Sequence, residues 1–116
     1  MNDRTAVLDE ADRLLEGEYG LGGRGPRIAA LLARSALEDW LDEQSASWTK
    51  QAYGFPTTRS KLVALGALRG AALGEQAKRV WHGLSIAVHR HAYELQPSLA
   101  EIRHLVSAVR ELQQQQ

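Results

Sequence analysis

The stretch "KRVWHGLSIAVHRHAY", residues 78 to 93, combines side chains that bind phosphate with side chains that transfer protons. Cationic side chains neutralise phosphate groups, and imidazole gains and loses protons near neutral pH. Hydroxyl groups in the same stretch can position a ligand. In chain order these candidates are Lys78, Arg79, His82, Ser85, His89 and Tyr93. Together they favour phosphate-ester chemistry over other reactions.

RNA is the phosphate ester that needs the fewest protein groups, because its 2′-hydroxyl is already a nucleophile. A metal-independent ribonuclease then requires little more than a cation and a proton-transfer group. We therefore predict Arg79, His82 and His89 as catalytic residues, with Arg79 as the phosphate anchor.

The remaining three candidates, Lys78, Ser85 and Tyr93, are predicted to bind substrate. Two other interpretations of the whole set stay open, because a solvent-exposed helix face or a dimer contact would have the same residue types. Exposed helix surfaces are usually built from residues such as glutamate, lysine and glutamine. A row with two histidines, a serine and a tyrosine is therefore suggestive of function.

A helix over residues 72–95 would place these candidates on one face. Relative to Leu84, an apolar stripe falls within about 40° at 100° per residue; it comprises Leu73, Ala77, Val80, Leu84, Val88, His91 and Leu95. The polar row lies on the opposite side at steps of three and four residues, so its members are surface neighbours. His91 lies on the apolar stripe, where a core histidine bonded to a carbonyl is favoured over a ligand.

Metal binding is not predicted. His82 and His89 are seven residues apart, roughly 10 Å along a helix axis, too far for two ligands of one ion. The chain has no cysteine, which excludes thiolate metal sites, thiolate chemistry and disulfides. We expect neither a metal nor another cofactor.

Four further segments show apolar residues at helical spacing, namely 3–16, 26–46, 58–69 and 98–113. A Gly-rich loop over 17–25 and an aromatic loop over 47–57 would connect the first three. Apolar residues cover well over half the circumference of 26–46, which predicts a central helix. No segment shows sustained two-residue alternation. We therefore predict one all-α domain over 1–116, an up-and-down bundle of four to five helices.

Local signals mark where these helices begin and end. Pro26 suits the first position of its helix, and Gly70 and Gly74 suggest a break before the helix over 72–95. Ser98, with Glu101 three residues later, forms the S-x-x-E capping pattern. A further pattern, G-x-G-x-x-G within 20–25, follows a predicted helix instead of a buried strand, which favours a connection over a phosphate cradle.

The composition limits the classes of function. Lysine plus arginine number 14, and aspartate plus glutamate also number 14. Binding of nucleic acid through the overall charge of the protein is therefore disfavoured, and only a local basic patch could bind it. The N-terminal residues lack the apolar region of a secretory signal, and no apolar run reaches the length of a membrane span. We expect a cytoplasmic protein that does not contact membranes.

The order of the helices and the distribution of apolar and polar residues along them resemble the HEPN superfamily (higher eukaryotes and prokaryotes nucleotide-binding). The resemblance rests on the apolar helix "AALLARSALEDWLDE", the motif W-x-x-L-S at 81–85 beside arginine and histidine, and a closing amphipathic helix. The string "LSIAVHRHAYEL" is similar to small helical proteins of actinobacteria and their phages near this group. The signature of the family is an arginine followed, after four to six intervening residues, by a histidine, and this signature is absent here. Its residue types correspond to Arg79, His82 and His89.

The resemblance implies a homodimeric helical bundle with metal-independent RNA cleavage, in toxin–antitoxin or antiphage (phage defence) systems. Its partners would be RNA or a nucleotide and an antitoxin, phage or defence protein. A second interpretation is a non-enzymatic adaptor, such as an immunity or phage accessory factor, that binds a protein through Leu31 and Ile86. A third is a DNA-binding helical regulator, which lacks a convincing helix-turn-helix pattern.

Overall fold

The computed structural model of the chain describes residues 3–17, 20, 24–49, 57–89 and 98–114. All regular structure in these residues is α-helical, which confirms the prediction of an all-α bundle. The helices are α1 (Asp3–Leu15), α2 (Arg24–Thr49), α3 (Thr58–Arg69), α4 (Ala71–His89) and α5 (Leu99–Gln114).

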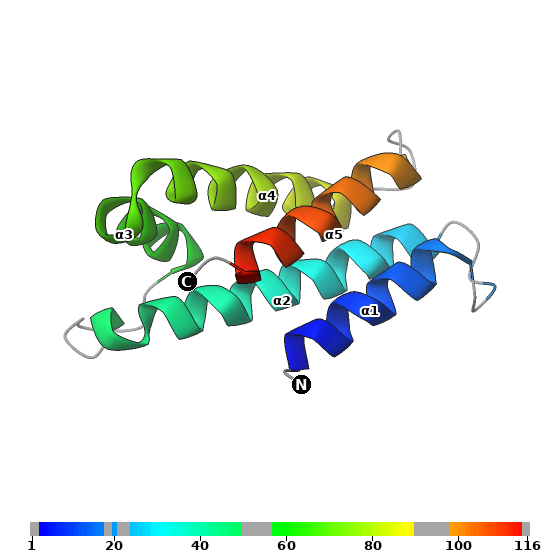
Figure 1. Cartoon of the computed structure of the whole chain (residues 1–116). Helices are drawn as coiled ribbons and strands as arrows, with labels where there is room; N and C mark the ends of the chain where they lie inside the picture. The colour runs from blue at the N-terminus through cyan, green and yellow to red at the C-terminus, as the bar shows by residue number, and fades with distance from the viewer. Residues whose placement is uncertain (1–2, 18–19, 21–23, 50–56, 90–97, 115–116) are drawn as a thin grey trace.

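The long helix α2 is the centre of the bundle, as its wide apolar arc predicted. It contacts each of the other four helices. In Figure 1, α1 returns alongside one half of α2, α4 lies across the molecule from them, and α5 crosses obliquely between α4 and α2. Side chains of α2 and α4 therefore meet along a shared boundary, which positions the candidate site.

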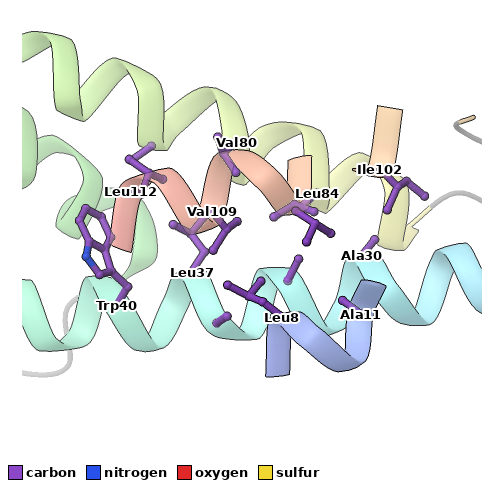
Figure 2. Packing of buried hydrophobic residues seen from close by; sticks show 14 of the residues in the cluster. Leu8, Ala11, Ala30, Leu37, Trp40, Val80, Leu84, Ile102, Val109 and Leu112 are labelled. Atoms are coloured by element: carbon purple, nitrogen blue, oxygen red, sulfur yellow. The ribbon is translucent and has the colours of Figure 1, made fainter. Parts of the chain in front are cut away.

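The core is one cluster contributed by all five helices. On α2, Ala29, Ala30, Ala33 and Ala36 are buried and small, so neighbouring helices approach its axis closely. Trp40, also on α2, is 1% exposed and is the largest fully buried side chain. Figure 2 shows it within the cluster that holds residues of α1, α4 and α5. The packing of these faces fixes the rotation of α4 about its own axis, and so which of its residues face outward.

Helix α2 is longer than the sequence predicted at both ends. It begins at Arg24, so Pro26 is its third residue instead of its first. Proline is tolerated there because the first four backbone N–H groups of a helix have no intrahelical acceptor to lose. At the other end α2 continues to Thr49, which shortens the predicted aromatic loop. Tyr53 and Phe55 of that loop lie outside the described residues.

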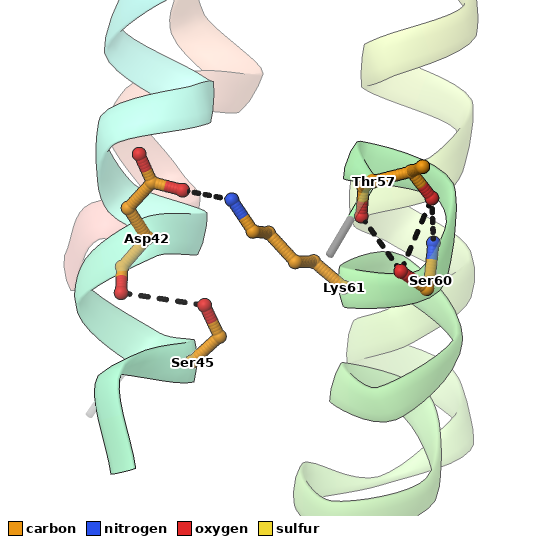
Figure 3. Close-up of polar contacts among 5 residues, drawn as sticks. All are labelled: Asp42, Ser45, Thr57, Ser60 and Lys61. Carbon is orange, nitrogen blue, oxygen red and sulfur yellow. Dashed lines mark hydrogen bonds and ion pairs between the residues drawn. The ribbon is translucent and has the colours of Figure 1, made fainter. Parts of the chain in front are cut away.

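Side-chain caps begin α3 and α5. The Thr57 hydroxyl accepts a hydrogen bond from the Ser60 N–H at 3.1 Å at the start of α3. Figure 3 shows this cap next to an ion pair between Lys61 and Asp42, which ties α3 to α2. At the start of α5, the Ser98 hydroxyl accepts from the Glu101 N–H at 3.1 Å, which confirms the predicted Ser98 cap.

The break between α3 and α4 is at Gly70, whose φ of 119° is a backbone conformation that favours glycine. Gly74 does not break the chain; it is buried inside α4. A Cβ atom at Gly74 would overlap Gly66 Cα and lie 2.8 Å from Gly66 N. The two glycines therefore allow α3 and α4 to cross almost backbone to backbone.

Arg110 joins α5 to α1 through two ion pairs. Its Nη2 atom lies 2.8 Å from Asp9 Oδ1 and 2.6 Å from Asp12 Oδ2. Burial alone would lower the pKa of Arg110, but the hydrogen bonds and charges of Asp12 and Asp9 outweigh it and raise that pKa above its ordinary value. The guanidinium therefore remains charged wherever the bundle is folded.

We expect Arg110→Gln to lower the free energy of unfolding by about 1 kcal/mol, since partly exposed pairs contribute a few tenths each and this cation serves two carboxylates. Urea unfolding at low and high salt would measure the loss, and it should shrink as salt screens the pairs. Arg103→Gln on the same helix is the control, because Arg103 is exposed and has no ion-pair partner in the described part of the chain. Equal losses for both variants would contradict the prediction.

None of the helices in the described segments combines the length and apolarity needed to cross a membrane.

Candidate functional site

Helix α4 holds the described part of the predicted polar row, which runs from Lys78 to His89. Its residues Ala71 to His89 form one uninterrupted helix. Leu84 is fully buried, whereas Lys78, Arg79, His82 and His89 are exposed. The inward and outward faces therefore lie where the periodicity placed them, as far as the helix is described.

One member of the row, His89, contacts a second helix. Arg34 of α2 reaches it, with 3.2 Å between Arg34 Nη1 and His89 Nε2. The Arg34 guanidinium also stacks over Trp81, 4.7 Å from the ring centroid, and its Nε lies 3.4 Å from Glu38 Oε1. Arg34 and Glu38 are one turn apart on α2. We call Arg27, Arg34, Glu38, Trp81 and His89 the α2–α4 seam.

The Arg34–His89 contact selects one tautomer of the neutral imidazole. A guanidinium has only donors. In the neutral ring Nε2 of His89 is then the acceptor, and the ring proton lies on Nδ1. A neutral imidazole of this kind can receive a proton once Arg34 moves to another anion.

Positive charge outweighs negative charge at the seam. Arg27 Nε donates to the Val88 carbonyl at 2.9 Å, and this bond satisfies one of the open carbonyls at the end of α4. The first turn of α2 has no acidic residue. Glu38 is thus the seam's one carboxylate against two guanidinium groups. Stacking on Trp81 and bonding to Glu38 hold Arg34 in place while its Nη2 remains available to a ligand.

Ser85 lies one helical turn from both Trp81 and His89. It is half-buried, and its hydroxyl is shielded from solvent without a hydrogen-bond partner in the described structure. A shielded hydroxyl without a partner is unusual in a folded protein. No bond between Ser85 and His89 forms, so the pair is not a nucleophile and base in this state.

The other predicted residues border two different grooves. Arg79 lines a groove of about 510 Å³ between α4 and α5, where His104 and Ser107 of α5 face it. Lys78 lines a groove of about 480 Å³ between α3 and α4. His82 is exposed one turn from Arg79. These residues follow one another along α4, but they lie in three separate environments: the seam, the α4–α5 groove and the α3–α4 groove.

Two predicted positions, Tyr93 and His91, lie outside the described residues, and the interpretation of each remains a prediction. Sequence reasoning missed the roles of Arg34, Trp81 and His104. Arg34 lies on the polar strip of its helix, which was the available signal, but its contact with His89 spans 55 residues of sequence.

Within the described ranges, no group of three or more histidine, cysteine, aspartate or glutamate side chains is arranged to hold a metal ion. No protein-family model, curated protein or solved structure matches the chain. What the seam can do therefore follows from its own side chains.

Proposed function

We propose that this protein is a HEPN-like helical bundle that handles RNA or a nucleotide at the α2–α4 seam. The observation that carries the proposal is the contact of Arg34 with His89 at 3.2 Å, with Trp81 beneath the guanidinium. A phosphate-binding cation and a proton-transfer group are thereby held together at the surface.

Binding would begin with the phosphate. The Arg34 guanidinium offers a planar set of donors that matches phosphate oxygens, and Arg27 adds a second cation on the same side of α2. His82 and Arg79 continue the surface along α4, so a strand of RNA could follow that helix with its backbone. A local basic surface of this kind is compatible with balanced overall charge.

In RNA cleavage, the substrate phosphate and His89 would compete for the Arg34 guanidinium. A substrate phosphate draws the guanidinium away from His89 and leaves Nε2 with a free lone pair. That nitrogen then takes the proton of the 2′-hydroxyl, whose oxygen attacks the neighbouring phosphorus and displaces the 5′-oxygen of the next nucleotide. His82 is the candidate to return a proton to that leaving oxygen.

The wider setting follows the resemblance. We propose a cytoplasmic homodimer in a toxin–antitoxin or antiphage system, with an antitoxin or phage component as protein partner. Two copies would bring two outer faces of α4 to one substrate, which supplies groups that a single row lacks.

Fluorescence-monitored binding and cleavage of a single-stranded RNA tests the proposal. Arg34→Gln is expected to weaken binding about tenfold, the worth of one charge-assisted hydrogen bond. His89→Ala is expected to leave binding nearly unchanged and to reduce cleavage roughly 100-fold or more, the usual contribution of a general base. Wild-type binding should weaken steeply as salt rises.

Arg103→Gln and His104→Ala supply the matched controls, since both residues are exposed on α5, away from the seam. Thermal unfolding of each variant by circular dichroism separates lost function from lost structure. If Arg79→Gln and His104→Ala abolish binding while Arg34→Gln retains it, the seam is not the site.

Exposed apolar side chains favour one alternative, a non-enzymatic adaptor that binds a protein partner. Leu31 on α2 is 51% exposed and Ile86 on α4 is 40% exposed. The adaptor interpretation requires both side chains to be accessible to a partner. Burial of such side chains against a partner depends little on salt, whereas phosphate binding depends on it strongly. The salt series above therefore distinguishes the two functions.

A further inference from the structure

The groove between α3 and α4 is lined by small and apolar side chains that the proposed function does not use. Its volume of about 480 Å³ falls within the range of small-molecule sites. Val63, which lines it, is 69% exposed, a large apolar surface left to solvent. Its apolar lining consists of Leu62, Val63, Gly66, Ala67, Ala71 and Gly74.

Two cations border the same groove. Arg59 of α3 and Lys78 of α4 line it, and neither has an ion-pair or hydrogen-bond partner among the residues that the structure describes. Elsewhere in the bundle, basic side chains such as Arg4 and Arg110 are each shared between two carboxylates. Arg59 and Lys78 thus remain available to an anion.

The cations lie at one end of the groove. Gly66 and Gly74 touch where α3 and α4 cross, four residues on either side of the turn at Gly70. Arg59 and Lys78 are farther along the chain from that turn than either glycine. The groove therefore has a cationic end and, at the helix crossing, an apolar end.

We propose that the α3–α4 groove binds an amphiphile with one anionic headgroup and a linear hydrocarbon tail. The headgroup lies between Arg59 and Lys78, and the tail lies against Val63 and Ala67 towards the helix crossing. The small side chains of Ala67 and Ala71, beside the crossing, leave room for an unbranched chain. Glu75, which also lines the groove, sets the orientation, because its carboxylate repels a headgroup placed nearer the turn.

Titration with decanoate, followed by two-dimensional ¹H–¹⁵N NMR, tests the proposal. The amide signals of Gly66 and Gly74 should shift in a saturable way, while those of Gly17 and Gly83 should stay in place. Decyl phosphate distinguishes the headgroup chemistry, and binding of both compounds indicates that charge, not carboxylate shape, is recognised. Decanol and decyltrimethylammonium should bind at least about tenfold more weakly, since neither is an anion.

The variant Arg59→Gln with Lys78→Gln should weaken decanoate binding about tenfold, because two exposed cations each contribute modestly. Arg79→Gln is the control: it removes one positive charge at the residue after Lys78 on α4, but Arg79 lines the α4–α5 groove. Equal affinity for decanol, or shifts spread over Leu31 and Ile86 instead, would show general apolar adsorption and overturn the proposal. RNA binding by the single variant Arg59→Gln is expected to persist, so this groove and the seam are tested separately.

Discussion

Replacing Trp40 with alanine is expected to lower the free energy of unfolding by about 3–5 kcal/mol. Trp40 is 1% exposed and lies on α2, the helix that contacts all the others. Truncation removes its buried apolar surface and leaves a cavity that the four surrounding helices cannot close independently, because each is already packed on α2. The loss is a large share of the roughly 5–15 kcal/mol that stabilises a typical domain.

Urea unfolding followed by far-ultraviolet circular dichroism measures this loss. Trp81→Ala is the control, since it removes the same side chain from a half-buried position on the seam. The control should lose much less stability but should weaken RNA binding, because Arg34 would lose the ring on which it stacks. If the two variants unfold at the same urea concentration, Trp40 is not the central packing residue.

The helices and their faces were predictable because both are local properties. Apolar spacing identified α2 as the central helix, and the packing-stripe residues Leu73, Ala77, Val80 and Leu84 are buried as expected. Ser98 caps α5 because its hydroxyl lies within one turn of the Glu101 N–H that donates to it. The ends of α2 were less predictable: proline is compatible with any position in the first turn, and nothing at 47–49 stops a helix.

The candidate site was only partly predictable because it depends on how helices cross. Periodicity identified His89 as an outward residue of α4, but not that Arg34 would meet it from α2. The same pattern placed Lys78 and Arg79 side by side, whereas the neighbouring helices separate them into two grooves. Helix crossings arise from packing between residues distant in sequence, which spacing within one helix does not encode.

The glycine contact between α3 and α4 shows the same limit. Glycine inside a helix costs about 1 kcal/mol relative to alanine, so Gly66 and Gly74 look like weaknesses of their helices. The helix crossing explains why glycine is present at both positions. The absence of side chains there lets the two backbones come together at the apolar end of the α3–α4 groove. One of the two glycines should therefore be far less replaceable than the other.

Gly74→Ala is expected to destabilise the bundle by about 3 kcal/mol, at the upper end of overpacking effects, despite the better helix propensity of alanine. The new Cβ would overlap Gly66 Cα, and backbone atoms cannot turn aside as a side chain can. Gly66→Ala should be neutral or slightly stabilising, because its Cβ would meet Gly74 Cα at an ordinary 3.6 Å. Both are interior helix positions, so propensity alone predicts equal gains, and a thermal melt that ranked them equal would contradict the close crossing. Because α3 must move away from α4 in the Gly74 variant, decanoate binding should fall with stability there and persist in the Gly66 variant.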